Sequence, residues 1–121
     1  MARVLVVDDS ELQRRSIETI VRGIGHEVVL ANDGNEGLTV FKNGGIDLIL
    51  ADHNMPVLTG LEMCQEIMKI TAGSPPPILM VTTEVGSADE KAAAKKVGVK
   101  AWIIKPYRDD AVAKVVEKLL A

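Results

Sequence analysis

The chain has 121 residues, a length typical of a single domain. Its 14 basic and 17 acidic residues give a net charge of −3, which argues against a protein that binds nucleic-acid phosphates. One cysteine and two histidines exclude an internal disulfide and a structural zinc site. No apolar run is long enough to span a membrane, and residues 1–8 lack the long apolar stretch of a signal peptide. We therefore expect a single cytoplasmic domain with neither a nucleic-acid partner nor a membrane-inserted segment.

Five short apolar runs predict the strands, in chain order, at residues 4–7, 28–30, 48–50, 78–81 and 102–104. Continuous apolar runs of this kind are typical of strands buried on both faces. Apolar residues at helical spacing predict helices near residues 17–24, 61–68 and 112–119, and weaker patterns predict two more near 38–41 and 92–96. Strands that alternate with helices predict an α/β domain with a parallel sheet and helices on both faces.

Polar residues mark the starts of four of these helices. Each pair consists of a capping residue and a partner three positions later: Ser10 with Gln13, Asp33 with Glu36, Thr59 with Glu62, and Ser87 with Glu90. Three glycines lie where helices are expected to end: Gly23, Gly44 and Gly98.

Ligands of a parallel α/β sheet bind at the carboxyl ends of the strands, so the residues that follow each run are informative. They are Asp8 and Asp9, Asp52, Thr82 and Thr83, and Lys105, which precedes Pro106. Three neighbouring carboxylates repel one another, and Mg²⁺, which prefers oxygen ligands, relieves that repulsion. Together with a lysine and a hydroxyl, this set indicates phosphoryl transfer to an aspartate. Alone, Asp8 and Asp9 also fit a helix cap, and Thr82 an ordinary strand end.

Five motifs in this order resemble the receiver domain of two-component response regulators, most closely the chemotaxis-type single-domain regulators. The motifs are Val6–Ser10, Ala31–Gly34, Asp52–Pro56 with Gly60, Val81–Thr83, and Lys105–Pro106. The resemblance covers the whole chain and implies one receiver domain over residues 1–121. It also implies a flavodoxin-like, doubly wound (βα)5 fold with strand order 2-1-3-4-5, and a cis bond before Pro106.

The family assigns roles to the matching positions. The resemblance implies that Asp52 accepts a phosphoryl group from a sensor histidine kinase. It implies Mg²⁺ ligands at Asp8, acting largely through water, at Asp9 and Asp52, and at the backbone carbonyl of Asn54. Thr82 and Lys105 would bind the phosphoryl group, with support from the backbone N–H groups of His53 and Thr83. Asn54 and Glu84 occupy positions that tune dephosphorylation.

The resemblance also implies a switch between Thr82 and the aromatic residue three positions before Lys105, here Trp102. Two residues depart from the family pattern: an indole stands where tyrosine or phenylalanine is usual, and Thr83 where a small residue is common. Trp102 is equally compatible with a partly exposed surface aromatic. Receivers commonly bind downstream proteins through the fourth helix, fifth strand and fifth helix, so we expect a protein target there.

Four alternatives remain open from the sequence. The chain ends with the expected fifth helix, which predicts no attached output domain, yet a phosphorelay intermediate or a receiver cut from a larger regulator has the same pattern. A Mg²⁺-dependent phosphatase or phosphotransferase is disfavoured, because Ser10 stands where such enzymes place a second acid. A scaffold that is not phosphorylated is disfavoured by the complete acidic set. We expect a switch with self-catalysed chemistry and not a metabolic enzyme.

Overall fold

The computed structural model describes residues 1–121, and its ten elements alternate from strand to helix. The strands are β1 (Arg3–Val7), β2 (Glu27–Ala31), β3 (Leu48–Ala51), β4 (Ile78–Thr82) and β5 (Val99–Ile104). The helices are α1 (Glu11–Gly23), α2 (Gly34–Lys42), α3 (Gly60–Ile70), α4 (Ala88–Lys96) and α5 (Asp109–Leu120). The predicted number and order of elements are confirmed. None of the helices combines the length and apolar character needed to cross a membrane.

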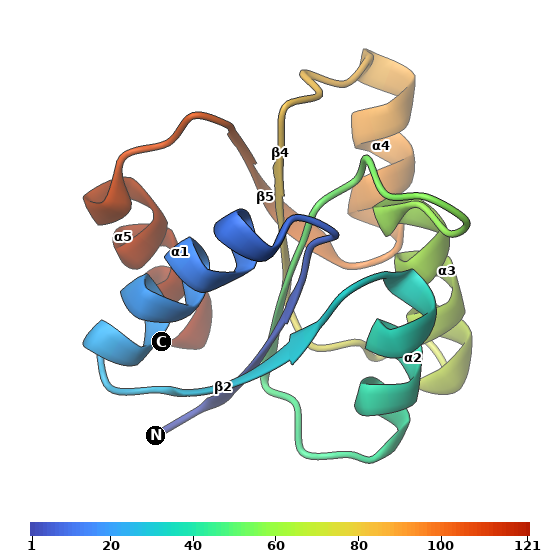
Figure 1. Ribbon diagram of the computed structural model, residues 1–121. Coiled ribbons are helices and arrows are strands. Elements are labelled where there is room, and N and C mark those ends of the chain that lie inside the picture. The colour runs from blue at the N-terminus through green and yellow to red at the C-terminus, as the bar shows by residue number, and fades with distance from the viewer.

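All five strands run parallel in one sheet of order β2-β1-β3-β4-β5. Helices α1 and α5 cover one face, and α2, α3 and α4 cover the other (Figure 1). This confirms the expected doubly wound, flavodoxin-like fold with strand order 2-1-3-4-5. The strand order reverses between β1 and β3, so their carboxyl ends open the crevice in which such folds bind ligands.

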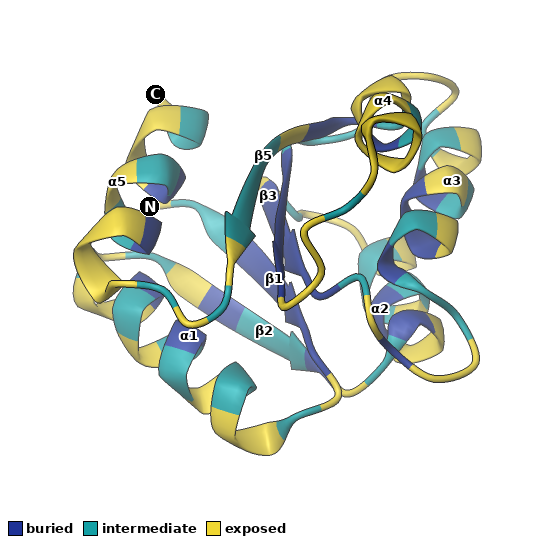
Figure 2. Ribbon diagram, turned by 90° about the horizontal axis from the view of Figure 1, so that it is seen from above, coloured by how far each residue is buried: buried dark blue, intermediate teal, exposed yellow.

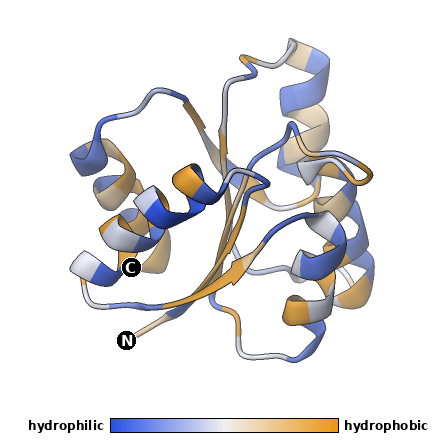
Figure 3. Ribbon diagram, viewed as in Figure 1, coloured by the Kyte–Doolittle hydropathy of each residue, from blue (hydrophilic) through white to orange (hydrophobic).

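Two apolar layers hold the helices to the sheet. On one face, Ile17 and Val21 of α1 and Val112 and Val116 of α5 pack against the strands. On the other face, the largest buried contribution comes from α3, through Met63, Cys64 and Ile67. The central strands are buried along almost their whole length (Figure 2) and carry the most hydropathic residues (Figure 3). Each fully buried aliphatic side chain stabilises the fold by about 1.5–3 kcal/mol. The buried strands therefore fix the positions of the polar residues that follow them.

The four predicted helix starts are also confirmed. In each case the side-chain oxygen of the capping residue accepts a hydrogen bond from the backbone N–H three positions later. At α3 and α4 the glutamate side chain in turn accepts the backbone N–H of the capping residue, which completes a capping box. A cap of this kind contributes about 1 kcal/mol to stability and fixes the residue at which the helix begins.

The fifth strand begins earlier than its apolar run predicts, at Val99 and not at Trp102. Lys100 interrupts the run, and its side chain is exposed. The pairing with β4 shifts register there, because Ile78 pairs with Val99 while Leu79 pairs with Ala101. An edge strand with an irregular register accommodates a charged residue that a central strand excludes.

Candidate functional site

The carboxyl ends of β1 and β3 bring three aspartates together. Asp8 and Asp9 follow β1, Asp52 follows β3, and one carboxylate oxygen from each lies within 4.8 Å of the other two. Asp8 is 1% exposed and Asp52 7% exposed, whereas Asp9 is exposed. The parallel pairing of β1 with β3 aligns Val7 with Ala51, and this register places the following aspartates at one level. The predicted acidic cluster is therefore formed.

Lys105 enters the cluster from the end of β5. Its Nζ lies 2.7 Å from an oxygen of Asp8 and 3.1 Å from an oxygen of Asp52. The backbone N–H of Lys105 donates to the carbonyl of Thr82, which continues the β4–β5 pairing to this point. The bond between Lys105 and Pro106 is cis, as the resemblance implied. One lysine thus contacts both buried carboxylates, although 53 residues separate it from the nearer one in sequence.

Burial shifts the ionisation of this cluster. Burial, joined by repulsion from Asp52, raises the pKa of Asp8 by more than Lys105 and the Ser10 N–H lower it. For Lys105, burial lowers the pKa, but hydrogen bonds and charge attraction from Asp8 and Asp52 outweigh it, so its pKa is raised overall. The lysine is firmly cationic. One cation does not fully compensate the buried carboxylates, so the cluster favours additional positive charge.

The oxygen atoms present fit a hard divalent cation. Asp8 and Asp52 each use one oxygen to accept a backbone N–H, from Ser10 at 2.9 Å and from Asn54 at 3.0 Å. These bonds orient the two carboxylates, while the carboxylate of Asp9 has no hydrogen-bond partner. Mg²⁺ prefers oxygen ligands and retains several waters, which suits a cluster with two buried carboxylates and one exposed one. Asn54, two residues after Asp52 in the loop between β3 and α3, is exposed.

Thr82 ends β4 and is completely buried. Its hydroxyl accepts the backbone N–H of Glu84 at 3.2 Å, and the carbonyl of Glu84 accepts the indole N–H of Trp102 at 2.8 Å. Trp102 is partly buried and lies over Gly86, where an added Cβ would come within 3.0 Å of the indole ring. The side chains of Thr83 and Glu84 are exposed. The structure therefore connects Thr82 to Trp102 through the backbone of one intervening residue.

Gly60 permits the loop that carries Asp52. A Cβ at this position would lie 2.5 Å from the carbonyl oxygen of Asp52 and 2.9 Å from the Cα of His53. The Gly60 N–H donates to the carbonyl of His53 at 3.0 Å, which closes the loop between β3 and α3. The sequence placed Gly60 in a motif, and the structure supplies the steric reason for it.

Sequence reasoning did not find the contacts of the His53 ring. The ring accepts the backbone N–H of Leu61 and lies near the carboxylate of Glu90 and the ring of Trp102. No spacing pattern signals these contacts, because the partners come from three separate elements. His26 and Cys64 lie away from the cluster: His26 accepts the N–H of Ala2, and Cys64 is buried in the core.

Comparison with known proteins identifies the family to which this chain belongs. The model of the response regulator receiver domain family matches residues 4–117. The chain belongs to this family. A chemotaxis protein CheY homolog from Campylobacter jejuni is 37% identical over 120 residues, which cover 98% of this chain and 92% of that protein. Protein PilH from Pseudomonas aeruginosa is 30% identical and covers 100% of this chain and 99% of its own length.

Solved structures agree with this assignment. The chemotaxis protein CheY4 of Vibrio cholerae superposes with a TM-score of 0.91 at 37% identity, covering 99% of both chains. The response regulator TrrA of Thermotoga maritima, determined with Mg²⁺ and beryllium fluoride, gives a TM-score of 0.87 at 29% identity and covers 99% of this chain and 100% of its own. The chain is thus the receiver domain of a CheY-like response regulator. Domains of this family are signalling regulators that use Mg²⁺ at an acidic pocket.

Proposed function

We propose that residues 1–121 form one receiver domain whose Asp52 accepts a phosphoryl group from the phosphohistidine of a sensor kinase. An oxygen of Asp52 forms the new bond to phosphorus as the bond between phosphorus and the histidine nitrogen breaks, and the histidine leaves as a neutral imidazole once protonated. The observation that carries the proposal is the position of Asp52 between Asp8, Asp9 and Lys105. That neighbourhood supplies both an oriented nucleophile and a cation.

Asp8, Asp9 and Asp52, with the backbone carbonyl of Asn54, are the groups that would hold Mg²⁺. When bound, the ion neutralises charge on the carboxylates and on the entering phosphoryl oxygens. Support comes from the acidic cluster and from a similar response regulator, TrrA, solved with Mg²⁺ and beryllium fluoride. Lys105 is already seated at the oxygens of Asp8 and Asp52 and pairs with the phosphoryl group after transfer.

Thr82 and Trp102 form the proposed switch. A phosphoryl group adds a charge of about −1.5 to −2 and several strong acceptors, so it attracts the Thr82 hydroxyl. That hydroxyl now accepts the Glu84 N–H, and a new bond to the phosphoryl group alters the position of the loop. Asn54 and Glu84, both exposed beside this loop, are the proposed tuning residues for hydrolysis of the acyl phosphate.

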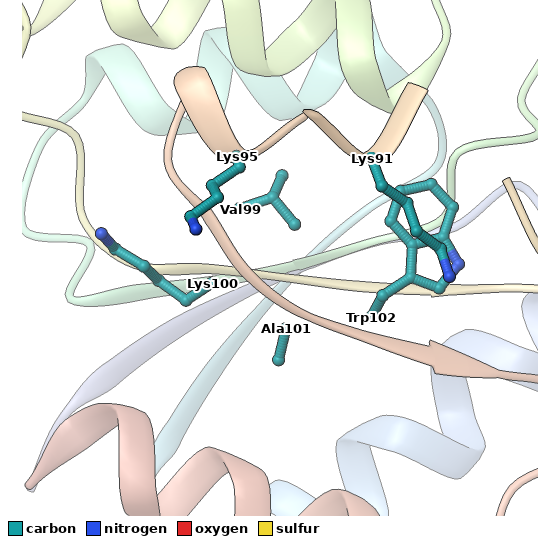
Figure 4. A pocket seen from close by; sticks show the side chains of 6 residues that line it. All are labelled: Lys91, Lys95, Val99, Lys100, Ala101 and Trp102. Atoms are coloured by element: carbon teal, nitrogen blue, oxygen red, sulfur yellow. The ribbon is translucent and has the colours of Figure 1, made fainter. Parts of the chain in front are cut away.

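The downstream partner is a protein that binds the surface of α4, β5 and α5. A pocket of about 310 Å³ lies on this surface, lined by Lys91, Lys95, Val99, Lys100, Ala101 and Trp102 (Figure 4). None of its three lysines forms an ion pair within the chain. An acidic segment of a partner protein fits this lining. The match to chemotaxis proteins over 92% and 99% of their length supports a chemotaxis-type regulator.

Intact-mass spectrometry after incubation with Mg²⁺ and acetyl phosphate tests the proposal. We expect one added phosphoryl mass that EDTA prevents and that Asp52→Asn abolishes. Asp47→Asn is a suitable control, since Asp47 is an acid outside the cluster, bonded to the backbone of Arg3. A phosphoryl mass that persists in Asp52→Asn, or its absence from the wild-type protein, would overturn the assignment.

A further inference from the structure

The side chain of His53 extends from the phosphorylation loop, residues 52–59 between β3 and α3, to the start of α4. His53 directly follows Asp52, and its side chain is only 16% exposed. Its Nδ1 accepts the backbone N–H of Leu61, at the start of α3, with a distance of 3.4 Å. Its Nε2 lies 3.6 Å from Oε2 of Glu90, in the first turn of α4. One ring therefore lies between the loop and two helix starts.

The hydrogen bond from Leu61 determines how the ring faces Glu90. A nitrogen that accepts an N–H carries no proton, so the proton of the neutral ring is on Nε2. The protonated Nε2 lies 3.6 Å from Oε2 of Glu90, which is longer than a hydrogen bond, so the contact is an attraction between the N–H dipole and the carboxylate.

Glu90 divides its two oxygens between this contact and the helix cap. Its Oε1 accepts the backbone N–H of Ser87 at 3.0 Å, while the Ser87 hydroxyl accepts the Glu90 N–H at 3.1 Å. Its Oε2 faces His53. The residue that begins α4 is therefore the same residue that contacts the neighbour of Asp52.

Few other contacts hold α4 in place. Ala94 is its only buried residue, so the helix contributes little apolar area to the core. Near its first turn, Lys91 lies over the Trp102 ring at 5.9 Å, and the Trp102 ring centroid is 6.2 Å from that of His53. An element with so little buried apolar surface responds to small changes in its polar contacts.

We propose that His53 is a positioning residue that holds the first turn of α4 to the phosphorylation loop through Glu90, so that a change at Asp52 reaches α4 along this route. The route runs through the adjoining residue of the chain and is separate from the one through Thr82 and Glu84. The inference rests on the proposed function of Asp52 for its signalling meaning. The contact between His53 and Glu90 itself does not depend on phosphorylation.

Hydrogen exchange of the amides of residues 87–92 tests the inference, measured with and without Mg²⁺ and beryllium fluoride. Glu90→Gln is the informative variant, because glutamine retains the capping box but removes the charge that faces His53. We expect these amides to exchange roughly two- to fivefold faster in the unliganded variant, and their response to beryllium fluoride to decrease. Asp89→Asn, in the same turn, is the matched control and should behave like the wild-type protein.

A second variant, His53→Phe, keeps a ring but loses both nitrogens. We expect it to accelerate exchange in α4 like Glu90→Gln, and the double variant to add nothing further, as for two residues that act through one contact. Wild-type exchange and response in His53→Phe, whatever Glu90→Gln does, or additive effects in the double variant, would refute the inference. Acetyl phosphate labelling of Glu90→Gln should equal that of wild type. If labelling fails in the wild-type protein, the proposed function fails, while unliganded exchange still decides the role of His53.

Discussion

The indole of Trp102 is hydrogen-bonded to the backbone carbonyl of Glu84, across from β5 to the loop after β4, at 2.8 Å. The backbone N–H of Glu84 donates to the Thr82 hydroxyl at 3.2 Å. Glu84 is therefore held on one side by the buried Thr82 and on the other by the indole of Trp102. If the proposed switch operates, we expect a shift of the Thr82 hydroxyl to move the loop that carries Glu84 and, through it, Trp102.

This relationship predicts a fluorescence signal. Trp102 is the only tryptophan, so the tryptophan emission reports on the surroundings of this one side chain. We expect Mg²⁺ with beryllium fluoride to change the emission of the wild-type protein. Thr82→Val should abolish most of the change, because valine retains the shape but lacks the hydroxyl. Thr82→Ser, which keeps the hydroxyl, should retain the change in emission. An equal change in the valine and serine variants would contradict a role for the hydroxyl.

The buried carboxylate of Asp8 predicts a conflict between stability and metal binding. Its pKa is raised, chiefly by burial, so the charged form destabilises the folded protein at neutral pH. Asp8→Asn should raise the free energy of unfolding of the metal-free protein by about 1 kcal/mol. Asp110→Asn, on the exposed start of α5, is the control and should change stability little.

Added Mg²⁺ should stabilise the wild-type protein more than Asp8→Asn. A ligand that binds only the folded state stabilises it, so Mg²⁺ should raise the unfolding temperature of the wild-type protein more than that of Asp8→Asn. Thermal denaturation with EDTA and with Mg²⁺ measures both effects. If Asp8→Asn is less stable than wild type without metal, the buried charge of Asp8 does not destabilise the fold. If Mg²⁺ stabilises both proteins equally, Asp8 does not contribute to binding the ion.

Much of this fold follows from local sequence signals, and the reason is visible in particular residues. Val4–Val7 and Ile78–Val81 are apolar because both faces of a central strand are buried, and Ser87 with Glu90 marks a helix start through two short-range bonds. The acidic cluster also follows, since parallel strands end at one edge. The contacts of His53 do not follow, because they join residues far apart in the chain. Lys100 conceals the start of β5 for a similar reason: only pairing with β4 reveals it.

Gly60 predicts a steric requirement at the phosphorylation loop. Gly60→Ala would place a Cβ 2.5 Å from the Asp52 carbonyl oxygen, which is fixed backbone. We expect a loss of about 1–3 kcal/mol in stability and a lower yield of phosphorylated protein. Gly23→Ala is the matched control, because nothing lies within 4 Å of its Cβ and alanine favours a helix. Urea denaturation compares the two, and an unaffected Gly60→Ala would show that the loop adapts.

Cys64 predicts a loss of stability at alkaline pH. Burial raises the pKa of its thiol to about 12, whereas an unfolded chain releases that proton near pH 8.5. The folded state therefore retains a proton that the unfolded state loses. Its contribution is complete below about pH 8.5 and falls by roughly 1.4 kcal/mol per pH unit above it.

Urea denaturation of wild-type protein and Cys64→Ala between pH 7 and 10 isolates this effect from lysine and tyrosine ionisation. Alanine leaves a cavity whose cost does not depend on pH, so the informative quantity is the difference in the free energy of unfolding between the two proteins at each pH. We expect that gap to narrow above about pH 8.5, because only the wild-type protein loses the thiol contribution. Parallel curves would mean that the folded and unfolded states bind the Cys64 proton equally tightly, and burial would then not raise the pKa of the thiol.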